Sequence, residues 1–340
     1  MSEKQVVSRH GSLMVYQDLL VATLPLLAMA VFLYGPRPAL LWLAAVVTAN
    51  LCDQLVALLR HRPFDPLEFS NESFGAMLVL LLPASVSYYV VIVSVAVAVL
   101  VGKEAFGGLG CYPFHPTAVG YAVAAVSWPE QVFSFPQPGT WLPVVNAGSA
   151  GLMQSASYTL KNGGTPRIDT LNLMLGNYAG PMGATAVVIL VACALLLAVR
   201  RRIQWDAALP FLAACFAIAW LFPRMGRVGL ALPWVKAPVR LASVGYELCS
   251  GTILYTGIFM LSDPAILPRH RAARAAFGLT LGVVSMLYRY YGSYETGVCF
   301  AMILVGSFAS AFDRLHLRWL DRKEALNQLP LKKRATGPKI

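Results

Sequence analysis

Long apolar runs alternate with short polar breaks along most of the chain. Such runs occupy residues 19–34, 38–59, 73–83, 84–102, 117–134, 184–199, 206–222, 243–261, 275–291 and 297–312. Because about 20 apolar residues span the hydrocarbon core of a bilayer as a helix, the pattern predicts an all-α integral membrane protein with about ten transmembrane helices. Several runs are shorter than this, so we expect tilted or broken helices among them.

Two breaks rich in glycine, proline or tyrosine interrupt the pattern at comparable places in the two halves. The first covers residues 106–116 and the second residues 290–297. Each follows a short apolar helix, predicted over 70–83 in the first half and from 245 to 263 in the second. Five spans in each half would place the second half upside down relative to the first. The pattern therefore predicts two inverted five-helix repeats with broken helices, although chance likeness between apolar helices is a competing explanation.

The same pattern divides the chain into four parts. We expect the first repeat over 1–127, an external loop over 128–183, the second repeat over 184–312 and a basic cytoplasmic tail over 313–340. A connection as long as 128–183, rich in Pro, Gly, Ser and Asn, is typically functional or disordered. Leucines among the basic residues of the tail predict a helix lying at the membrane surface, in contact with lipids.

Composition and charge agree with a membrane protein. Hydrophobic residues make up 57% of the chain and charged residues 13%, with a formal net charge of +11. The basic residues concentrate in the segments that share a side with the N-terminus, which predicts cytoplasmic N- and C-termini. Because they are scattered over loops rather than gathered in one patch, they argue against nucleic-acid binding. The six cysteines occur singly, which favours packing over metal binding.

The first break is the best candidate for a ligand site. Its glycines, Gly107, Gly108 and Gly110, permit backbone conformations that other residues avoid, and Tyr112 and His115 supply polar groups. Irregular backbone at membrane depth is tolerated only where protein or a polar cavity surrounds it. We therefore expect an internal site here, and an ordinary surface loop is the alternative.

Acidic residues in or beside apolar runs are candidates for an ion path, because an ionised carboxylate is costly in the membrane. Asp53 lies deepest in such a run, Asp263 precedes Pro264 at the end of another, and Glu295 lies in the second break. For Asp263 the alternative is a structural cap. No Walker loop, HExxH, nucleophile elbow or Rossmann glycine motif is present, which disfavours phosphoryl transfer, hydrolysis and direct nicotinamide binding.

The first break also carries a family resemblance. Phe106-Gly-Gly-Leu-Gly110, followed by Pro113-Phe114 and Val119-Gly120-Tyr121, resembles the D subunit of Rnf-type ion-translocating ferredoxin:NAD⁺ oxidoreductases. More distantly it is similar to the B subunit of the Na⁺-translocating NADH:quinone reductase. Weaker matches in the same order, Leu175-Gly176-Asn177 and Asp263-Pro264 among them, extend the likeness over most of the chain.

The resemblance implies a flavoprotein subunit that carries FMN covalently, through a phosphoester to a threonine. The corresponding residue looks like Thr165, within Asn162-Gly163-Gly164-Thr165-Pro166, although Asn162 and Gly164 replace the family's Ser and Ala. Thr185, or an ordinary Asn-Gly-Gly turn without flavin, are the alternatives. The resemblance also implies a second, non-covalent flavin such as riboflavin in the first break, where Tyr112 and His115 replace two asparagines.

As a function, the resemblance implies relay of electrons between ferredoxin and NAD⁺, coupled to Na⁺ or H⁺ translocation across the inner membrane of a prokaryote. The chain would act only within a complex of membrane and peripheral subunits, after loading by a flavin transferase. The alternative is a flavin-free secondary transporter or channel of the same architecture. In that case Asp53, His115 and Glu295 would line the path.

Overall fold

The computed structural model describes residues 3–61, 67–145, 151–166, 168–225, 237–294 and 296–328, with backbone alone for 3–12 and 324–328. The first half of the chain is helical, as its apolar runs predict. Its elements are α1 (Glu3–Tyr34), α2 (Arg37–Leu59), α3 (Ser70–Leu80), α4 (Tyr88–Leu100), η1 (Glu104–Phe106) and α5 (Pro116–Ser127).

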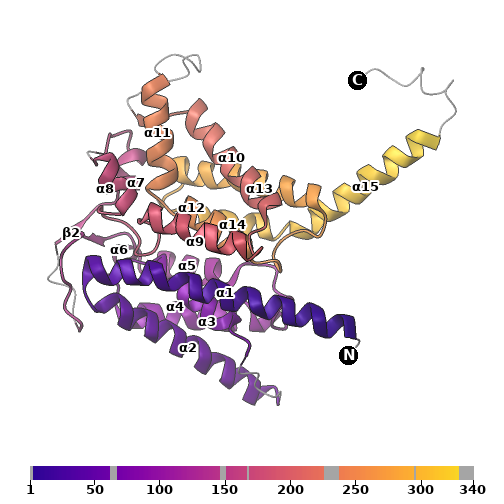
Figure 1. The fold of residues 1–340 in the computed structure, drawn as a ribbon, viewed down its shortest axis with the longest axis horizontal. Helices are drawn as coiled ribbons and strands as arrows, with labels where there is room; N and C mark the ends of the chain where they lie inside the picture. The colour runs from indigo at the N-terminus through magenta and orange to yellow at the C-terminus, as the bar shows by residue number, and fades with distance from the viewer. Residues whose placement is uncertain are drawn as a thin grey trace.

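The second half is built in the same way. It comprises α9 (Val187–Val199), α10 (Trp205–Leu221), α11 (Ala237–Cys249), α12 (Ile253–Ile258), η3 (Met260–Ser262), α13 (Arg271–Tyr291), α14 (Val298–Gly306) and α15 (Ala309–Gln328). In Figure 1 the helices of the first half form the lower part of the molecule and those of the second half the upper part, with α15 extending away from both.

The long connection between the halves carries more structure than its composition suggests. It contains α6 (Pro129–Val132), β1 (Phe135–Pro136), β2 (Leu152–Met153), α7 (Ala156–Lys161) and α8 (Thr170–Leu175), and β1 pairs antiparallel with β2. In Figure 1 these elements lie at the left end, opposite the start of α1 and the end of α15. The connection is therefore a small folded cap at one end of the helices.

Helix length supports several membrane crossings but does not establish ten. Among the described residues, three helices are long and apolar enough to span a bilayer: Leu13–Tyr34, Arg37–Leu59 and Tyr88–Phe106. Two bent pairs, Ala237–Cys249 with Ile253–Ser262 (61°) and Val298–Gly306 with Ala309–Lys323 (52°), raise the number to five if each is one broken span. The remaining apolar helices are short, so the count of ten stays a prediction.

Both predicted breaks are present, between η1 and α5 and between α13 and α14. One boundary differs from the expectation. The helix expected to begin at Gly245 begins at Ile253, because residues 245–249 belong to the preceding α11 and the chain bends between the two. Whether the halves are related by inversion stays a prediction.

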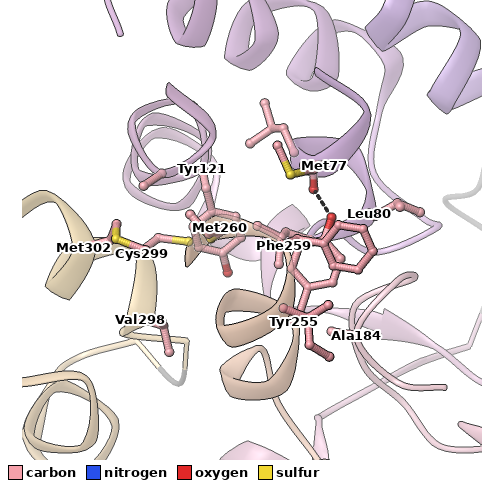
Figure 2. Packing of buried hydrophobic residues seen from close by; sticks show 14 of the residues in the cluster. Met77, Leu80, Tyr121, Ala184, Tyr255, Phe259, Met260, Val298, Cys299 and Met302 are labelled. Atoms are coloured by element: carbon pink, nitrogen blue, oxygen red, sulfur yellow. Dashed lines mark hydrogen bonds between the residues drawn. The ribbon is translucent and has the colours of Figure 1, made fainter. Parts of the chain in front are cut away.

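A continuous hydrophobic core joins the halves. The helices that follow the two breaks, α5 and α14, pack against each other. Tyr255 of α12 stacks on Phe259, with ring centroids 4.8 Å apart, and its hydroxyl donates to the Met77 carbonyl of α3 at 3.1 Å. Figure 2 shows them in one cluster with Tyr121 of the first half and Met302 of the second half. The two breaks are therefore held by one core.

Candidate functional site

The backbone of the first break requires its glycines. Gly107 ends η1 with a φ of +115°, and Gly108 follows at +91°, conformations that side-chain-bearing residues rarely adopt. Gly110 is left-handed as well, at +80°. The glycines thus turn the chain tightly between α4 and α5 and bring Tyr112 and His115 into the protein.

His115 lies at the inner end of this turn. It is the residue before Pro116, the first residue of α5, and is only 1% exposed. Its ring meets Phe74 of α3 edge-on, with centroids 5.3 Å apart. Neither ring nitrogen has a hydrogen-bond partner among the described residues. A buried imidazole without partners is costly for the free protein, so His115 is suited to receive a polar ligand.

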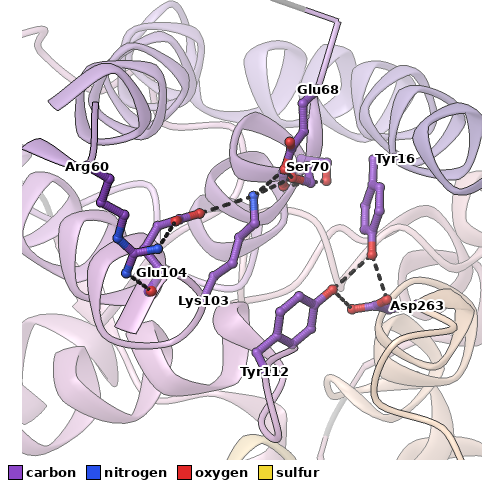
Figure 3. Close-up of polar contacts among 9 residues, drawn as sticks. Tyr16, Arg60, Glu68, Ser70, Lys103, Glu104, Tyr112 and Asp263 are labelled. Atoms are coloured by element: carbon purple, nitrogen blue, oxygen red, sulfur yellow. Dashed lines mark hydrogen bonds and ion pairs between the residues drawn. The ribbon is translucent and has the colours of Figure 1, made fainter. Parts of the chain in front are cut away.

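Tyr112 takes part in a buried polar ring with residues from two other segments. Its hydroxyl donates to Asp263 Oδ2 at 2.8 Å, and that of Tyr16, on α1, donates to Oδ1 at 2.9 Å. The two hydroxyl oxygens are also 2.8 Å apart (Figure 3). The backbone N–H of Ala265 donates to Oδ1 at 3.0 Å. The ring ties α1 and the first break to the end of η3.

A charged cluster lies beside the ring in the same view. Lys103, fully buried just before η1, donates through Nζ to Glu68 and to the Ser70 hydroxyl, both at 2.7 Å. Its Nζ is also 3.5 Å from Glu104, which pairs in turn with Arg60 at 3.5 Å (Figure 3). These pairs neutralise the lysine and hold the start of η1 in place.

The predicted attachment turn follows directly after α7. Asn162 ends that helix, Gly163 adopts a φ of +76°, and the Gly164 N–H donates to the Thr159 carbonyl at 2.9 Å. This is the glycine-terminated helix end typical of a Schellman motif. A β-carbon at Gly164 would meet the Thr159 side chain at 2.9 Å. Thr165 follows the turn and is exposed, so its hydroxyl is accessible from outside the protein.

Cationic and aromatic side chains surround this turn. Arg224 donates to the Lys161 carbonyl at 2.9 Å, and its guanidinium lies over the rings of Tyr290 and Tyr291, 4.8 and 5.3 Å from their centroids. Lys161 Nζ donates to the carbonyl of Ser293, in the second break, at 2.8 Å. The turn is thereby joined to the second break, with Tyr291 78% exposed beside it.

Buried contacts anchor α7, which precedes the turn, to helices of the second half. Arg289 of α13 pairs with Glu247 of α11, and it also donates to the Ser157 hydroxyl of α7 at 3.2 Å. The Tyr178 hydroxyl donates to the Cys249 carbonyl at 2.8 Å. Burial raises the pKa of the Tyr178 phenol, which keeps it a donor at neutral pH.

The remaining sequence-predicted residues do not join either site directly. Asp53 is half-buried on α2, within electrostatic reach of Lys103 and Glu68. Glu295 lies outside the described residues. Thr185 is 1% exposed, and its hydroxyl has no partner among the described residues. The structure thus brings Asp263 together with Tyr112 and leaves Asp53 apart from them.

Two functional candidates escaped the sequence analysis, Tyr16 and Arg224. Tyr16 is one aromatic residue in an apolar helix, which is ordinary in membrane proteins, and its partners are 96 and 247 residues away. Arg224 lies in the connection between α10 and α11, with other basic residues. No local pattern distinguishes either one, because their roles arise from tertiary contacts.

Comparison with known proteins identifies the family of this sequence. The family described as NQR2, RnfD, RnfE matches residues 4–318, nearly the whole chain. The chain belongs to this family. Membership accounts for the glycine break and the order of motifs that the sequence displays, and it confirms the resemblance on which the flavin expectations rest.

Individual relatives within the family are similar along most of their length. The D subunit of the ion-translocating oxidoreductase complex of Alcanivorax borkumensis is 28% identical over 87% of this chain and 89% of its own. That of Pseudomonas paraeruginosa is 29% identical over 86% of each. The D subunit of the proton-translocating ferredoxin:NAD(+) oxidoreductase complex of Clostridium ljungdahlii is 24% identical over 86% of this chain and 87% of its own.

Proposed function

We propose that this chain is the flavin-carrying membrane subunit of an Rnf-like complex, which relays electrons between ferredoxin and NAD⁺ and couples their transfer to translocation of Na⁺ or H⁺. The observation that carries the proposal is family membership over nearly the whole chain, joined to an exposed threonine on a glycine turn at the outer end of the helices. The named relatives are subunits of ion-translocating oxidoreductase complexes.

The residues of the outer turn fit a covalently bound FMN. The hydroxyl of Thr165 is accessible, and the turn of Asn162, Gly163 and Gly164 places it directly after the end of α7. Arg224 and Lys161 supply positive charge beside the turn, which suits a phosphoester. When bound, FMN supplies one- and two-electron transfer. The chain's own contribution is to hold the phosphate end of the FMN and to limit where its isoalloxazine ring can reach.

Thr185 is a poorer attachment site on the same criteria. Its hydroxyl is buried, and Tyr178 and Gly180 pack close to the same residue. A transferase would have to unfold this segment to reach the oxygen. The contrast in exposure supports Thr165 as the residue that carries FMN.

The first break supports a second, non-covalent flavin, such as riboflavin, only in part. The unpartnered nitrogens of His115 and the glycine backbone of Gly107, Gly108 and Gly110 could contact a flavin. The Tyr112 hydroxyl is already engaged by Tyr16 and Asp263, so Tyr112 could offer a flavin only its ring. We assign the second flavin to the His115 side of the break.

For the coupled ion, we propose a path that uses Asp53, Asp263 and Glu295. Asp263 has the strongest support, because it is fully buried where the first break meets the end of η3. Asp53 lies on α2, near the Lys103 cluster. The chain would work in a prokaryotic inner membrane with both termini cytoplasmic, α15 touching lipid, and a flavin transferase loading Thr165.

The test is whether the protein carries flavin at all. We would purify the complex from its host, record its visible spectrum, and view the denatured, gel-resolved chain under ultraviolet light. The proposal predicts flavin absorbance and a fluorescent band at the mass of this chain. A colourless complex with no fluorescent band would contradict the proposal and favour a flavin-free transporter or channel.

A further inference from the structure

We propose that Asp263 is a proton-binding site, in which the carboxyl is held as a neutral acid by Tyr16 and Tyr112, and that the ion it exchanges is H⁺ rather than a metal cation. That this proton takes part in translocation rests on the proposed function. The protonation of Asp263 itself rests on the geometry of the ring alone.

The hydrogen-bonded ring of Tyr16, Tyr112 and Asp263 needs one proton for each of its three contacts. Three oxygen–oxygen contacts of 2.8, 2.8 and 2.9 Å join Tyr16, Tyr112 and Asp263 in a closed triangle (Figure 3). Each hydroxyl carries one proton, and an ionised carboxylate carries none. If both hydroxyl protons point to the carboxylate, the two hydroxyl oxygens face each other at 2.8 Å with no proton between them.

A third proton on Asp263 satisfies all three contacts. Tyr16 then still donates to Oδ1. The bond that Tyr112 donates to Oδ2 when the carboxyl is ionised reverses, so that the protonated Oδ2 donates to the Tyr112 oxygen, and Tyr112 donates to the Tyr16 oxygen. Every oxygen donates or accepts in one direction around the ring, and Oδ1 still accepts from the Ala265 N–H. Hydrogen bonds that run in one direction strengthen one another, so a complete ring of this kind is stable.

The surroundings also favour the neutral acid. Asp263 is fully buried, and Tyr16 and Tyr112 are 1% and 3% exposed. Asp263 takes part in none of the ion pairs among the described side chains. Lys103, just before η1, and Glu68, just before α3, are the charged groups acting on the ring, and they pair with each other. An ionised carboxylate buried without a paired cation is costly, and such groups neutralise instead.

The same contacts make the site unsuited to a metal cation. Hard cations bind oxygen lone pairs, several at once. Here Oδ1 receives the Ala265 N–H and the Tyr16 hydroxyl, and Oδ2 lies against the Tyr112 hydroxyl. A cation would have to displace both phenols, whereas a proton completes the ring.

Loss of this proton has a mechanical consequence. With two protons left for three contacts, the ring must open, most readily between the two hydroxyl oxygens. Tyr16 belongs to α1, Tyr112 to the first break and Asp263 to the end of η3. Proton release therefore loosens the contact between α1 and the first break, next to the proposed flavin position at His115.

Infrared spectroscopy of the full-length chain in lipid nanodiscs, with ¹³C-labelled aspartate, tests this directly. We expect a protonated-carboxyl band at neutral pH that shifts with the label and is lost in Asp263→Asn. In Tyr112→Phe and Tyr16→Phe the band should move to higher wavenumber, because the carboxyl loses a hydrogen-bond partner. These two variants keep the assignment testable if Asp263→Asn does not fold.

Adding sodium distinguishes a proton site from a Na⁺ site. At fixed pH, added NaCl should leave the band unchanged relative to choline chloride. Absence of a carboxyl band that depends on Asp263, a band unaffected by both tyrosine variants, or its disappearance on adding sodium would overturn the proposal. The readout does not involve flavin. A colourless protein that shows the band contradicts only the proposed electron-transfer function, and a yellow protein that lacks it contradicts only this inference.

Discussion

The outer turn at Thr165 and the buried ring around Asp263 are organised in opposite ways. The turn is formed by consecutive residues, closed by bonds of short range, and exposed. The ring is assembled from α1, the first break and the end of η3, and is fully enclosed. The turn suits a group that an external enzyme must attach, whereas the ring suits a proton that must not exchange freely with water.

The largest effect should come from replacing Thr165 in the turn, and it should be on flavin content. Thr165→Ala should abolish the covalent flavin, because no other hydroxyl in the turn can form the phosphoester, while leaving the fold unchanged at this exposed position. The matched control is Thr185→Ala, which should keep the flavin. In-gel fluorescence of both variants decides between them, and fluorescence retained in Thr165→Ala would move the attachment site elsewhere.

The buried pair beneath the turn should dominate its stability. Glu247→Ala leaves the guanidinium of Arg289 buried without its partner, and we expect a loss of about 3–5 kcal/mol in unfolding free energy. Glu247→Gln, which keeps an oxygen for Arg289, should lose less. Denaturant unfolding in detergent measures both. Equal stability of all three proteins would show that the pair does not support the outer turn.

The ring should distinguish Asp263→Asn from Asp263→Ala. An amide donates on one side and accepts on the other, as a neutral acid does, so Asn should cost less than about 1 kcal/mol. Ala removes a hydrogen-bond partner from each tyrosine hydroxyl and should cost about 1–3 kcal/mol. Thermal unfolding of the two variants provides the comparison. If Asn proves as damaging as Ala, the carboxyl in the native ring is ionised.

The smallest effect concerns backbone strain at the turn. Gly163→Ala forces an alanine to a φ of +76°, at a cost of about 1 kcal/mol, and should lower the flavin-loaded fraction about fivefold if attachment needs the native turn. Gly139→Ala, with a φ of +80° and open space around it, imposes similar strain elsewhere in the connection. Flavin loading should be normal in that control. Equal losses in both would mean that strain acts on the whole connection.

The sequence predicted what is local and missed what is long-range. It located both breaks and the Asn-Gly-Gly turn, because glycine, proline and apolar periodicity act over a few residues. For Asp263 it offered a structural cap before Pro264 as the alternative to an ion-path role, and the Ala265 N–H does donate to Oδ1. Tyr16 and Arg224 could not be identified, because their contacts depend on how distant segments pack.

Secondary structure in the connection was underestimated for a related reason. Helices as short as α7 and α8 have little intrinsic stability and no clear periodicity. They are held by contacts with the second half, such as the Tyr246 hydroxyl donating to the Ile168 carbonyl at 2.6 Å and the Ser157 hydroxyl donating to the carbonyl of Ser250 at 3.0 Å. Composition alone therefore suggested a loop where a folded cap exists.

The central claim, that this chain carries a flavin on its outer turn, is tested most directly by the mass of one peptide. Trypsin cleaves after Lys161 and after Arg167, since neither is followed by proline, and so releases residues 162–167 apart from the peptide that contains Thr185. The account predicts that, in protein from the native complex, peptide 162–167 carries the added mass of FMN in phosphoester linkage. An unmodified 162–167 peptide, recovered in full from that complex, would contradict it.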